Sequence, residues 1–139
     1  MTAAIVALIV QLDGSPKVAR QLAPIVVAAA ARYQLDPRLL VAVVRNESRF
    51  RVDARGAKGE LGLAQVKRNT MATRGYDHLP DGALLRPALN LKLGARHLAR
   101  CRRICGGMAA PPERYLSVYN GRRYCRPSLY SKRVLARIR

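Results

Sequence analysis

Hydrophobic positions along the chain repeat at the three- and four-residue spacing of a helical face, and no stretch alternates long enough for a substantial sheet. Two helix starts are marked by a capping residue before a proline, at Ser15-Pro16 and at Asp36-Pro37, because proline suits the first turn of a helix. Pro24 is expected to kink or break the first of these helices. The full pattern predicts helices over 1–12, 16–33, 37–48, 63–74, 87–105, 112–120 and 128–139, with loops at 56–62 and 75–86.

This pattern indicates an all-α fold, and a length of 139 residues suits one compact domain over residues 1–139. In this interpretation residues 1–20 form an N-terminal helical extension. The segment from Met1 to Leu12 is apolar, but no basic residue precedes Lys17 and the segment is too short to span a membrane. We therefore expect a packed helix there rather than a signal peptide, and the sequence shows no export route of its own.

The chain carries 26 basic and 8 acidic residues, a net charge of +18, and most of the excess lies in residues 45–139, whose net charge is +16. Hydrophobic residues make up 50% of the chain, which excludes an intrinsically disordered protein. Such a positive charge favours anionic polymers, namely nucleic acid, an anionic membrane or a bacterial cell wall. Charge alone does not choose between these partners.

Three cysteines allow more than one arrangement. Cys101 and Cys105 are four residues apart on one predicted helical face, which is a poor arrangement for bridging each other, so free thiols are the favoured expectation. One bridge that involves Cys125 is the first alternative. The second alternative is a zinc site on His97, Cys101 and Cys105, which is weak because no C-x-x-C motif accompanies them. We expect no metal and no cofactor.

The most informative residue is Glu47, which ends an apolar helix three and four residues after Val44 and Val43. A carboxyl group on or beside a buried stripe is pushed toward a cleft or the core, where desolvation raises its pKa. A general acid for glycosidic cleavage needs a raised pKa, because it must still carry its proton near neutrality. The alternative is an ion pair at the helix end with Arg45, Arg49 or Arg51.

Several short motifs follow one another in the first 120 residues. They are Leu35-Asp36-Pro37 at a helix start, Arg45-Asn46-Glu47-Ser48 at its end, Gly59-Glu60-Leu61-Gly62-Leu63-Ala64-Gln65, the set Asn90, Gly94 and Leu98, and Val118-Tyr119-Asn120. In order and spacing these motifs resemble the lytic transglycosylase (SLT-type) family, over roughly residues 20–135. Any one motif is weak evidence, whereas their succession is strong evidence.

The resemblance implies a lysozyme-like fold with a groove for glycan strands, and a lyase that degrades peptidoglycan. Members of the family cleave the β-1,4 bond between N-acetylmuramic acid and N-acetylglucosamine without water, and they close the muramoyl sugar into an anhydro product. Glu47 is then the sole acid/base, which first protonates the glycosidic oxygen and then accepts the proton of the ring-closing hydroxyl. The N-acetyl group of the substrate replaces a second enzyme carboxylate.

The resemblance also implies a substrate-binding set, consisting of Ser48, Gly62, Leu63, Gln65, Tyr119 and Asn120. Gln65 matches a glutamine that contacts the sugar near the cut, and Tyr119 matches a tyrosine that orients the acid and the N-acetyl group. Without the resemblance these two would be a solvated helix residue and a buried aromatic residue. Asn120 matches a residue that braces this corner, and Ser48 is expected to make a hydrogen bond at the helix end.

The sequence departs from the family pattern at three positions. Ala64 replaces the usual methionine and is expected to open that part of the groove. Gly56 stands where many members have a serine that contacts the substrate, so one hydrogen bond to the sugar is in doubt. Arg68 stands where a proline usually opens the next helix.

Three other functions stay open at this point. A hydrolysing muramidase of the goose type would need a second carboxylate, from Asp53, Glu60, Asp77 or Asp81. A basic nucleic-acid-binding module is the alternative from a different class, although no helix-turn-helix or RNA-binding signature is present. A domain that only binds peptidoglycan is the third alternative.

The expected partners follow from the family and from the charge. We expect peptidoglycan glycan strands as the substrate, no nucleic acid, and anionic cell-wall polymers or outer-membrane lipopolysaccharide on the basic face. The expected site of action is the periplasm or the cell wall. The absence of a clear signal peptide suits a bacteriolytic phage enzyme, either a lysis enzyme (endolysin) or a virion enzyme.

Overall fold

The computed structural model describes residues 1–13 and 15–139, and most of them lie in helices. The helices are α1 (Thr2–Asp13), α2 (Pro16–Arg32), α3 (Pro37–Ser48), α4 (Asp81–Leu84), α5 (Pro87–Ile104), α6 (Pro112–Tyr119) and α7 (Leu129–Leu135), with a 3-10 helix at Gly107–Ala109. Two short strands, β1 (Glu60–Leu61) and β2 (Val66–Lys67), form an antiparallel hairpin. The predicted all-α fold is confirmed. Among the described residues, no helix has both the length and the apolar character that crossing a membrane requires.

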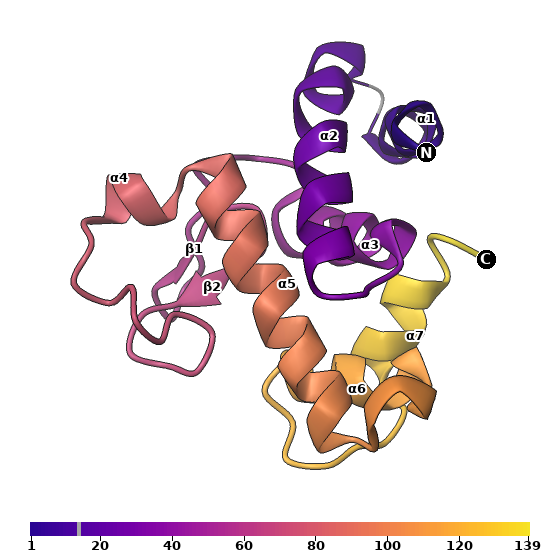
Figure 1. Cartoon of the computed structure of the whole chain (residues 1–139), viewed down its shortest axis with the longest axis vertical. Helices are drawn as coiled ribbons and strands as arrows, with labels where there is room; N and C mark the ends of the chain where they lie inside the picture. Colours follow the sequence, from indigo (N-terminus) through magenta and orange to yellow (C-terminus); the bar gives the residue numbers. More distant parts are fainter. Residues whose placement is uncertain (14) are drawn as a thin grey trace.

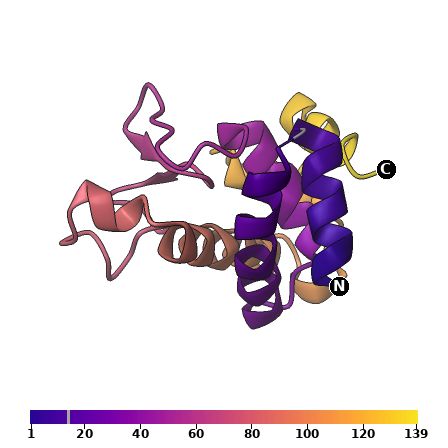
Figure 2. The same cartoon turned by 90° about the horizontal axis from the view of Figure 1, so that it is seen from above.

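Helix α5 links two parts of the molecule (Figures 1 and 2). Helices α1, α2 and α3 pack together at one side of α5, and α6 and α7 lie near its C-terminal end. The hairpin and α4 form a smaller part at its N-terminal end, which Figure 2 shows projecting away from the helices. Helix α3 is buried on all sides over Leu39–Val44, so it forms the centre of the main core. The predicted packed helix at the N-terminus is present, because Ile5 and Ile9 of α1 are buried in that core.

The proline-marked helix starts are observed where the pattern predicts them. The Asp36 carboxylate accepts a hydrogen bond from the backbone N–H of Arg38 at 2.9 Å, which caps α3. Ser15 occupies the corresponding position before α2, but its side chain makes no capping hydrogen bond. The break considered at Pro24 is not found, since α2 runs through it from Pro16 to Arg32.

The predicted helix over residues 63–74 is wrong. The chain there forms β2 and a series of turns, and the pairing joins Glu60 to Lys67 and Leu61 to Val66. Gln65 and Asn69 have φ angles of 51° and 62°, and left-handed backbone at two positions is incompatible with a continuous helix. The predicted loop over 75–86 is also incomplete, because it contains the short helix α4.

Asn90 joins the hairpin to α5. Its fully buried amide oxygen accepts from the backbone N–H of Ala64 at 2.8 Å, and its amide nitrogen donates to the carbonyls of Leu61 and Leu84, both at 2.9 Å. A Cβ at Gly62 would lie 2.4 Å from this amide, and the φ of Gly62 is +75°. Glycine at this position therefore permits both the turn and the close approach of the hairpin to α5.

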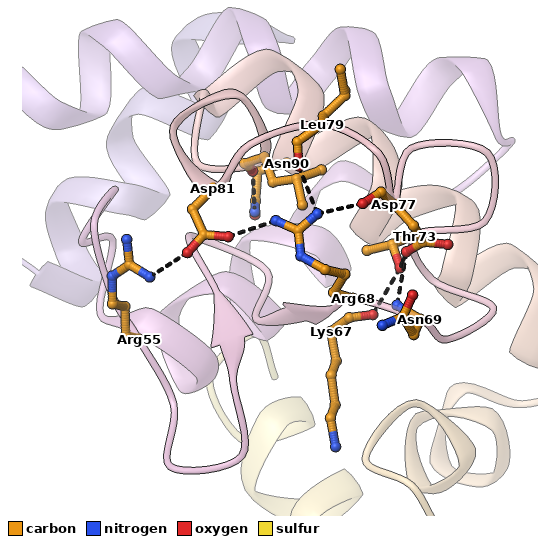
Figure 3. A network of polar contacts seen from close by, with 10 residues as sticks. Arg55, Lys67, Arg68, Asn69, Thr73, Asp77, Leu79, Asp81 and Asn90 are labelled. Atoms are coloured by element: carbon orange, nitrogen blue, oxygen red, sulfur yellow. Dashed lines mark hydrogen bonds and ion pairs between the residues drawn. The ribbon is translucent and has the colours of Figure 1, made fainter.

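A second polar network fixes the loop between β2 and α4 (Figure 3). The guanidinium of Arg68 donates to the carbonyls of Asp77 and Leu79, at 2.6 Å each. Its other terminal nitrogen pairs with Asp81 at 2.5 Å, and the second oxygen of Asp81 pairs with Arg55 at 2.9 Å. The side chain of Arg68 thus holds this loop together, in place of the backbone hydrogen bonds that the predicted helix over residues 63–74 would have made.

Replacement of Arg68 by lysine should destabilise the protein by about 2 kcal/mol, because one ammonium group cannot span two carbonyls and a carboxylate as a planar fork does. Replacement of Arg55 by lysine is the matched control, since Arg55 contacts the same Asp81 from an exposed position and should change stability little. Urea unfolding of both variants measures the difference. Equal losses would show that the carbonyl contacts of Arg68 carry no stability.

A disulfide joins Cys105 to Cys125, and Cys101 is a buried free thiol. The favoured expectation of free thiols throughout is therefore wrong, and the alternative of one bridge with Cys125 is the arrangement found. After α6 the chain turns back to the C-terminal end of α5 and so brings Cys125 beside Cys105. The spacing of the cysteines in the sequence does not indicate this pair. Cys105 is therefore not available to the zinc site considered above. No cluster of three side chains that could bind a metal occurs among residues 1–13 and 15–139.

Candidate active site

Glu47 lies in the last turn of α3, partly buried, and the hydroxyl of Tyr130 on α7 donates a hydrogen bond to its Oε1. Burial raises the pKa of Glu47, and the negative charge of Glu60 adds to this increase, while the hydrogen bond from Tyr130 opposes it. The net direction is upward, so Glu47 holds its proton to a higher pH than an ordinary glutamate does. The expected desolvation of this carboxyl is confirmed, and none of the ion pairs among the described residues involves Glu47.

A groove of about 750 Å³ opens at this carboxyl. Its walls come from the end of α3, the hairpin with the turns after it, the middle of α5 and the end of α6. The residues that line it are Glu47, Ala57, Lys58, Glu60, Gln65, Val66, Lys67, Thr70, Met71, Ala72, His97, Arg100, Val118, Tyr119, Asn120 and Gly121. The groove thus brings together residues from four separate stretches of the chain.

Gln65 lies in the groove on the turn between β1 and β2. Its amide nitrogen donates to the carbonyls of Ala54 at 3.2 Å and Gly62 at 3.0 Å. These bonds fix the amide plane, and they leave its Oε1 directed toward Gly56, where a Cβ would lie 2.7 Å away. Gln65 is therefore an ordered groove residue and not a solvated residue of a helix.

Tyr119 closes another wall of the groove at the end of α6. Its hydroxyl donates to the carbonyl of Ala64 at 2.6 Å, and its ring contacts the ring of His97, with 5.1 Å between the centroids. Burial, with a contribution from the charge of Glu47, raises the pKa of Tyr119 well above its ordinary value, so the hydroxyl stays protonated. Burial and the nearby arginines lower the pKa of His97 to about 4, so its ring is neutral at neutral pH.

The comparison with protein families shows to which family the domain with this groove belongs. The transglycosylase SLT domain family matches residues 24–124, more than half of the chain. This chain belongs to that family. The resemblance drawn from the motifs is confirmed, and the SLT domain accounts for α3, the hairpin, α5 and α6, the elements that form the groove.

Curated relatives of this SLT domain include membrane-bound lytic murein transglycosylase C of Actinobacillus pleuropneumoniae serotype 5b. It is 36% identical over 87 residues, which is 58% of this chain and 24% of the relative. The proteins of the same name from serotypes 3 and 7 match to the same extent. The chain therefore spans about a quarter of the length of these curated relatives.

A solved structure shares the fold. It is the X-ray structure of the lytic transglycosylase Slt from Pseudomonas aeruginosa, in an inactive mutant with glutamine in place of a glutamate. The two superpose with a TM-score of 0.59 at 26% identity, over 68% of this chain and 16% of Slt. The predicted lysozyme-like fold agrees with this likeness.

The SLT domain does not bring every predicted site residue to the groove. Ser48 is buried and its hydroxyl donates to the carbonyl of Val44 at 3.0 Å, so the expected hydrogen bond at the helix end is present. The Ser48 side chain does not line the groove. Gly62 and Leu63 are buried in the turn between β1 and β2 and do not line the groove. Asn120 follows α6 and lines the groove with an exposed side chain.

The expectation that Ala64 opens the groove is wrong. Ala64 is fully buried and does not line the groove, because it packs against α5 at Gly94. A Cβ at Gly94 would lie 2.4 Å from the Cβ of Ala64 and 3.4 Å from the hydroxyl oxygen of Tyr119. The small residues at positions 64 and 94 therefore allow the hairpin, α5 and Tyr119 to meet closely.

Sequence reasoning missed the role of Tyr130. It lies 83 residues after Glu47, and only the packing of α7 against α3 brings the two together. The available signal was the capping residue Ser128, followed by apolar residues at 130, 134 and 135, which indicates a helix with a buried face. That signal predicts burial of Tyr130 but not its partner.

Three of the four candidate second carboxylates lie away from Glu47. Asp77 and Asp81 belong to the network around Arg68, and Asp53 is exposed, and none of the three lines the groove. Glu60 does line it. Among the described acidic residues, Glu47 and Glu60 are the two that share the groove.

Proposed function

We propose that this SLT domain cleaves the β-1,4 bond between N-acetylmuramic acid and N-acetylglucosamine in peptidoglycan without water, and leaves an anhydromuramyl end. The observation that carries the proposal is Glu47, a partly buried carboxyl with a raised pKa, at the wall of a groove. Membership of the family supports it. The names of the relatives as lytic murein transglycosylases, and the inactive glutamate-to-glutamine mutant of Slt, support it further.

Glu47 acts twice in the proposed reaction. As a carboxylic acid it gives its proton to the glycosidic oxygen, and the bond from that oxygen to the anomeric carbon of the muramoyl sugar breaks with its electron pair on the leaving oxygen. The N-acetyl group of the same sugar stabilises the positive charge on the ring. The Glu47 carboxylate then accepts the proton of the muramoyl hydroxyl, whose oxygen bonds to the anomeric carbon. Glu47 ends protonated, as it began, and no water is consumed.

The surrounding side chains position Glu47 and the sugar for the two proton transfers. Tyr130 donates to one oxygen of Glu47 and so restricts the carboxyl to one orientation. Gln65 offers a fixed amide oxygen to the sugar, because its nitrogen is already bonded to two carbonyls. Tyr119, fixed through Ala64, forms a rigid wall against which the N-acetyl group is held.

Product analysis tests the proposed reaction. Purified sacculi are digested with the protein, and the released muropeptides are separated and weighed by mass spectrometry. The proposed reaction gives anhydromuramyl ends, lighter than hydrolysis products by one water. Reducing ends would indicate a muramidase, and no release would leave only a peptidoglycan-binding domain.

We further propose that the positive charge holds the enzyme on anionic wall polymers, including teichoic acids or outer-membrane lipopolysaccharide, in the periplasm or at the cell wall. The groove continues at Gly121 into a loop, residues 121–127, that we call the basic loop. Its residues Arg122, Arg123 and Arg126 are exposed, and the disulfide at Cys125 ties the loop to the end of α5.

Activity on whole sacculi should fall by roughly tenfold or more between low and high ionic strength, because salt screens attraction between the enzyme and the wall. Replacement of Arg122, Arg123 and Arg126 by serine should flatten this dependence. Turbidity loss of sacculi over a salt series measures both. An unchanged rate across the series would contradict the electrostatic attachment.

A further inference from the structure

Glu60 is a second carboxylate in the groove, and it is held in place. It lies on β1, half buried, and its Oε2 accepts a hydrogen bond from the backbone N–H of Lys58 at 3.1 Å. It lines the same groove as Glu47, and its negative charge is one of the causes that raise the pKa of Glu47. The charge of Glu60 therefore acts on Glu47 across the groove.

The room for this carboxylate comes from Gly56. A Cβ at Gly56 would lie 2.0 Å from Oε2 of Glu60 and 2.7 Å from Oε1 of Gln65. The Glu60 carboxylate thus occupies the space that a side chain at position 56 would fill, beside the amide of Gln65. A larger residue at 56 and the observed position of Glu60 exclude each other.

The other charged side chains that line the groove are positive. Lys58 and Lys67 line it from the hairpin and Arg100 from α5, and each positive charge favours the ionised form of a nearby carboxyl group. Tyr130, whose hydrogen bond also favours the ionised form of Glu47, and the neutral Tyr119 and His97 also belong to the site. Burial contributes most to keeping the proton on Glu47, and in a chain of net charge +18 the negative charge of Glu60 adds to it.

We propose that Glu60 is a positioning residue for the reaction: its carboxylate, seated in the space beside Gly56, keeps the proton on Glu47 until the glycosidic oxygen takes it. The inference rests on the proposed function of Glu47 as the acid. In this role Glu60 forms no bond to the sugar and transfers no proton. It offsets the positive side chains that line the groove, so that a strongly basic enzyme can hold a carboxylic acid near neutrality.

The test is the pH dependence of cleavage of soluble glycan strands by the Glu60→Gln variant. The alkaline limb of kcat/KM reports ionisation of the essential acid in the free enzyme. Loss of the Glu60 charge lowers the pKa of Glu47, so this limb should move to lower pH. The rate at neutral pH should fall by roughly tenfold, while the rate at acid pH stays near that of the wild type. Glu113→Gln is the matched control, because it removes one negative charge from a surface ion pair with Arg139, outside the groove.

Two further variants separate this role from a structural one. Gly56→Ser keeps the Glu60 charge but forces its carboxylate away, so it should move the alkaline limb in the same direction as Glu60→Gln. Tyr130→Phe removes the hydrogen bond that favours ionised Glu47, so it should move the limb to higher pH. Thermal unfolding of each variant checks that it is folded.

The outcomes distinguish the proposed role of Glu60 from the proposed function of the enzyme. An active wild type whose alkaline limb stays in place in both Glu60→Gln and Gly56→Ser would overturn the role of Glu60 and leave the proposed function intact. A limb that moves equally in the Glu113→Gln control would also overturn it, since overall charge would then explain the shift. A wild type that releases no product would instead remove the proposed function itself.

Discussion

Replacement of Glu47 by glutamine should lower the release of muropeptides by roughly a thousandfold, because general acid–base catalysis contributes on the order of 10² to 10⁴ in rate and this one group serves as both acid and base. Glutamine has the shape of glutamate and its amide oxygen can still accept the hydrogen bond from Tyr130, so the groove should keep its form. Initial rates on soluble glycan strands, measured over a pH series, give the ratio. The loss should be greatest at the pH values where Glu47 of the wild type holds its proton, and it should shrink along the alkaline limb, because the variant has no proton to give at any pH.

Two controls make this result specific to Glu47. Glu113→Gln makes the same chemical change on α6, outside the groove, and should keep the wild-type rate. Thermal unfolding should show that Glu47→Gln is at least as stable as the wild type, since it removes a carboxyl whose charge is disfavoured by burial. A variant that is folded and retains a tenth or more of the activity would contradict the role of Glu47 as the acid.

Loss of the disulfide between Cys105 and Cys125 should cost about 3 kcal/mol of stability, because the bridge closes a loop of 20 residues and so restricts the unfolded chain. For a domain of this size, the melting temperature should fall by roughly 10 °C. The same segment holds the groove residues from Val118 to Gly121, so activity should be lost at a lower temperature as well. Calorimetry of the double variant Cys105→Ser with Cys125→Ser measures the change.

Reduction provides the control for the disulfide prediction. A reducing agent should lower the melting temperature of the wild type to that of the double variant, and it should leave the double variant unchanged. Cys101 is buried and its pKa is raised to about 12, so it stays a thiol and does not replace a lost partner. A double variant as stable as the wild type would show that the bridge contributes nothing to the folded state.

The sequence predicted the helices well where a local signal marks their ends. Asp36-Pro37 begins α3 as expected, and the apolar face of that helix places Glu47 at its partly buried end. The segment after Gly62 was predicted wrongly because its apolar residues suit a helix, while the left-handed backbone of Gln65 and the contacts of Asn90 override that preference. These contacts come from α5, 26 residues away, and no local pattern contains them.

The candidate site was predictable where local sequence motifs mark its residues. Glu47, Gln65 and Tyr119 were found from the succession of motifs, and the structure brings all three to one groove. The partners of these residues were not predictable, since Tyr130 reaches Glu47 only through the packing of α7. Glu60 was one of four candidate carboxylates until the hairpin register and the space beside Gly56 placed it in the groove.

Digestion of purified sacculi in water labelled with heavy oxygen shows whether water takes part in the cleavage, when the wild type and Glu47→Gln are compared by mass spectrometry of the released muropeptides. The wild type should release anhydromuramyl ends that carry no label, and Glu47→Gln should release almost nothing. Reducing ends that carry the heavy oxygen would contradict the proposed reaction, because water would then have cleaved the glycosidic bond.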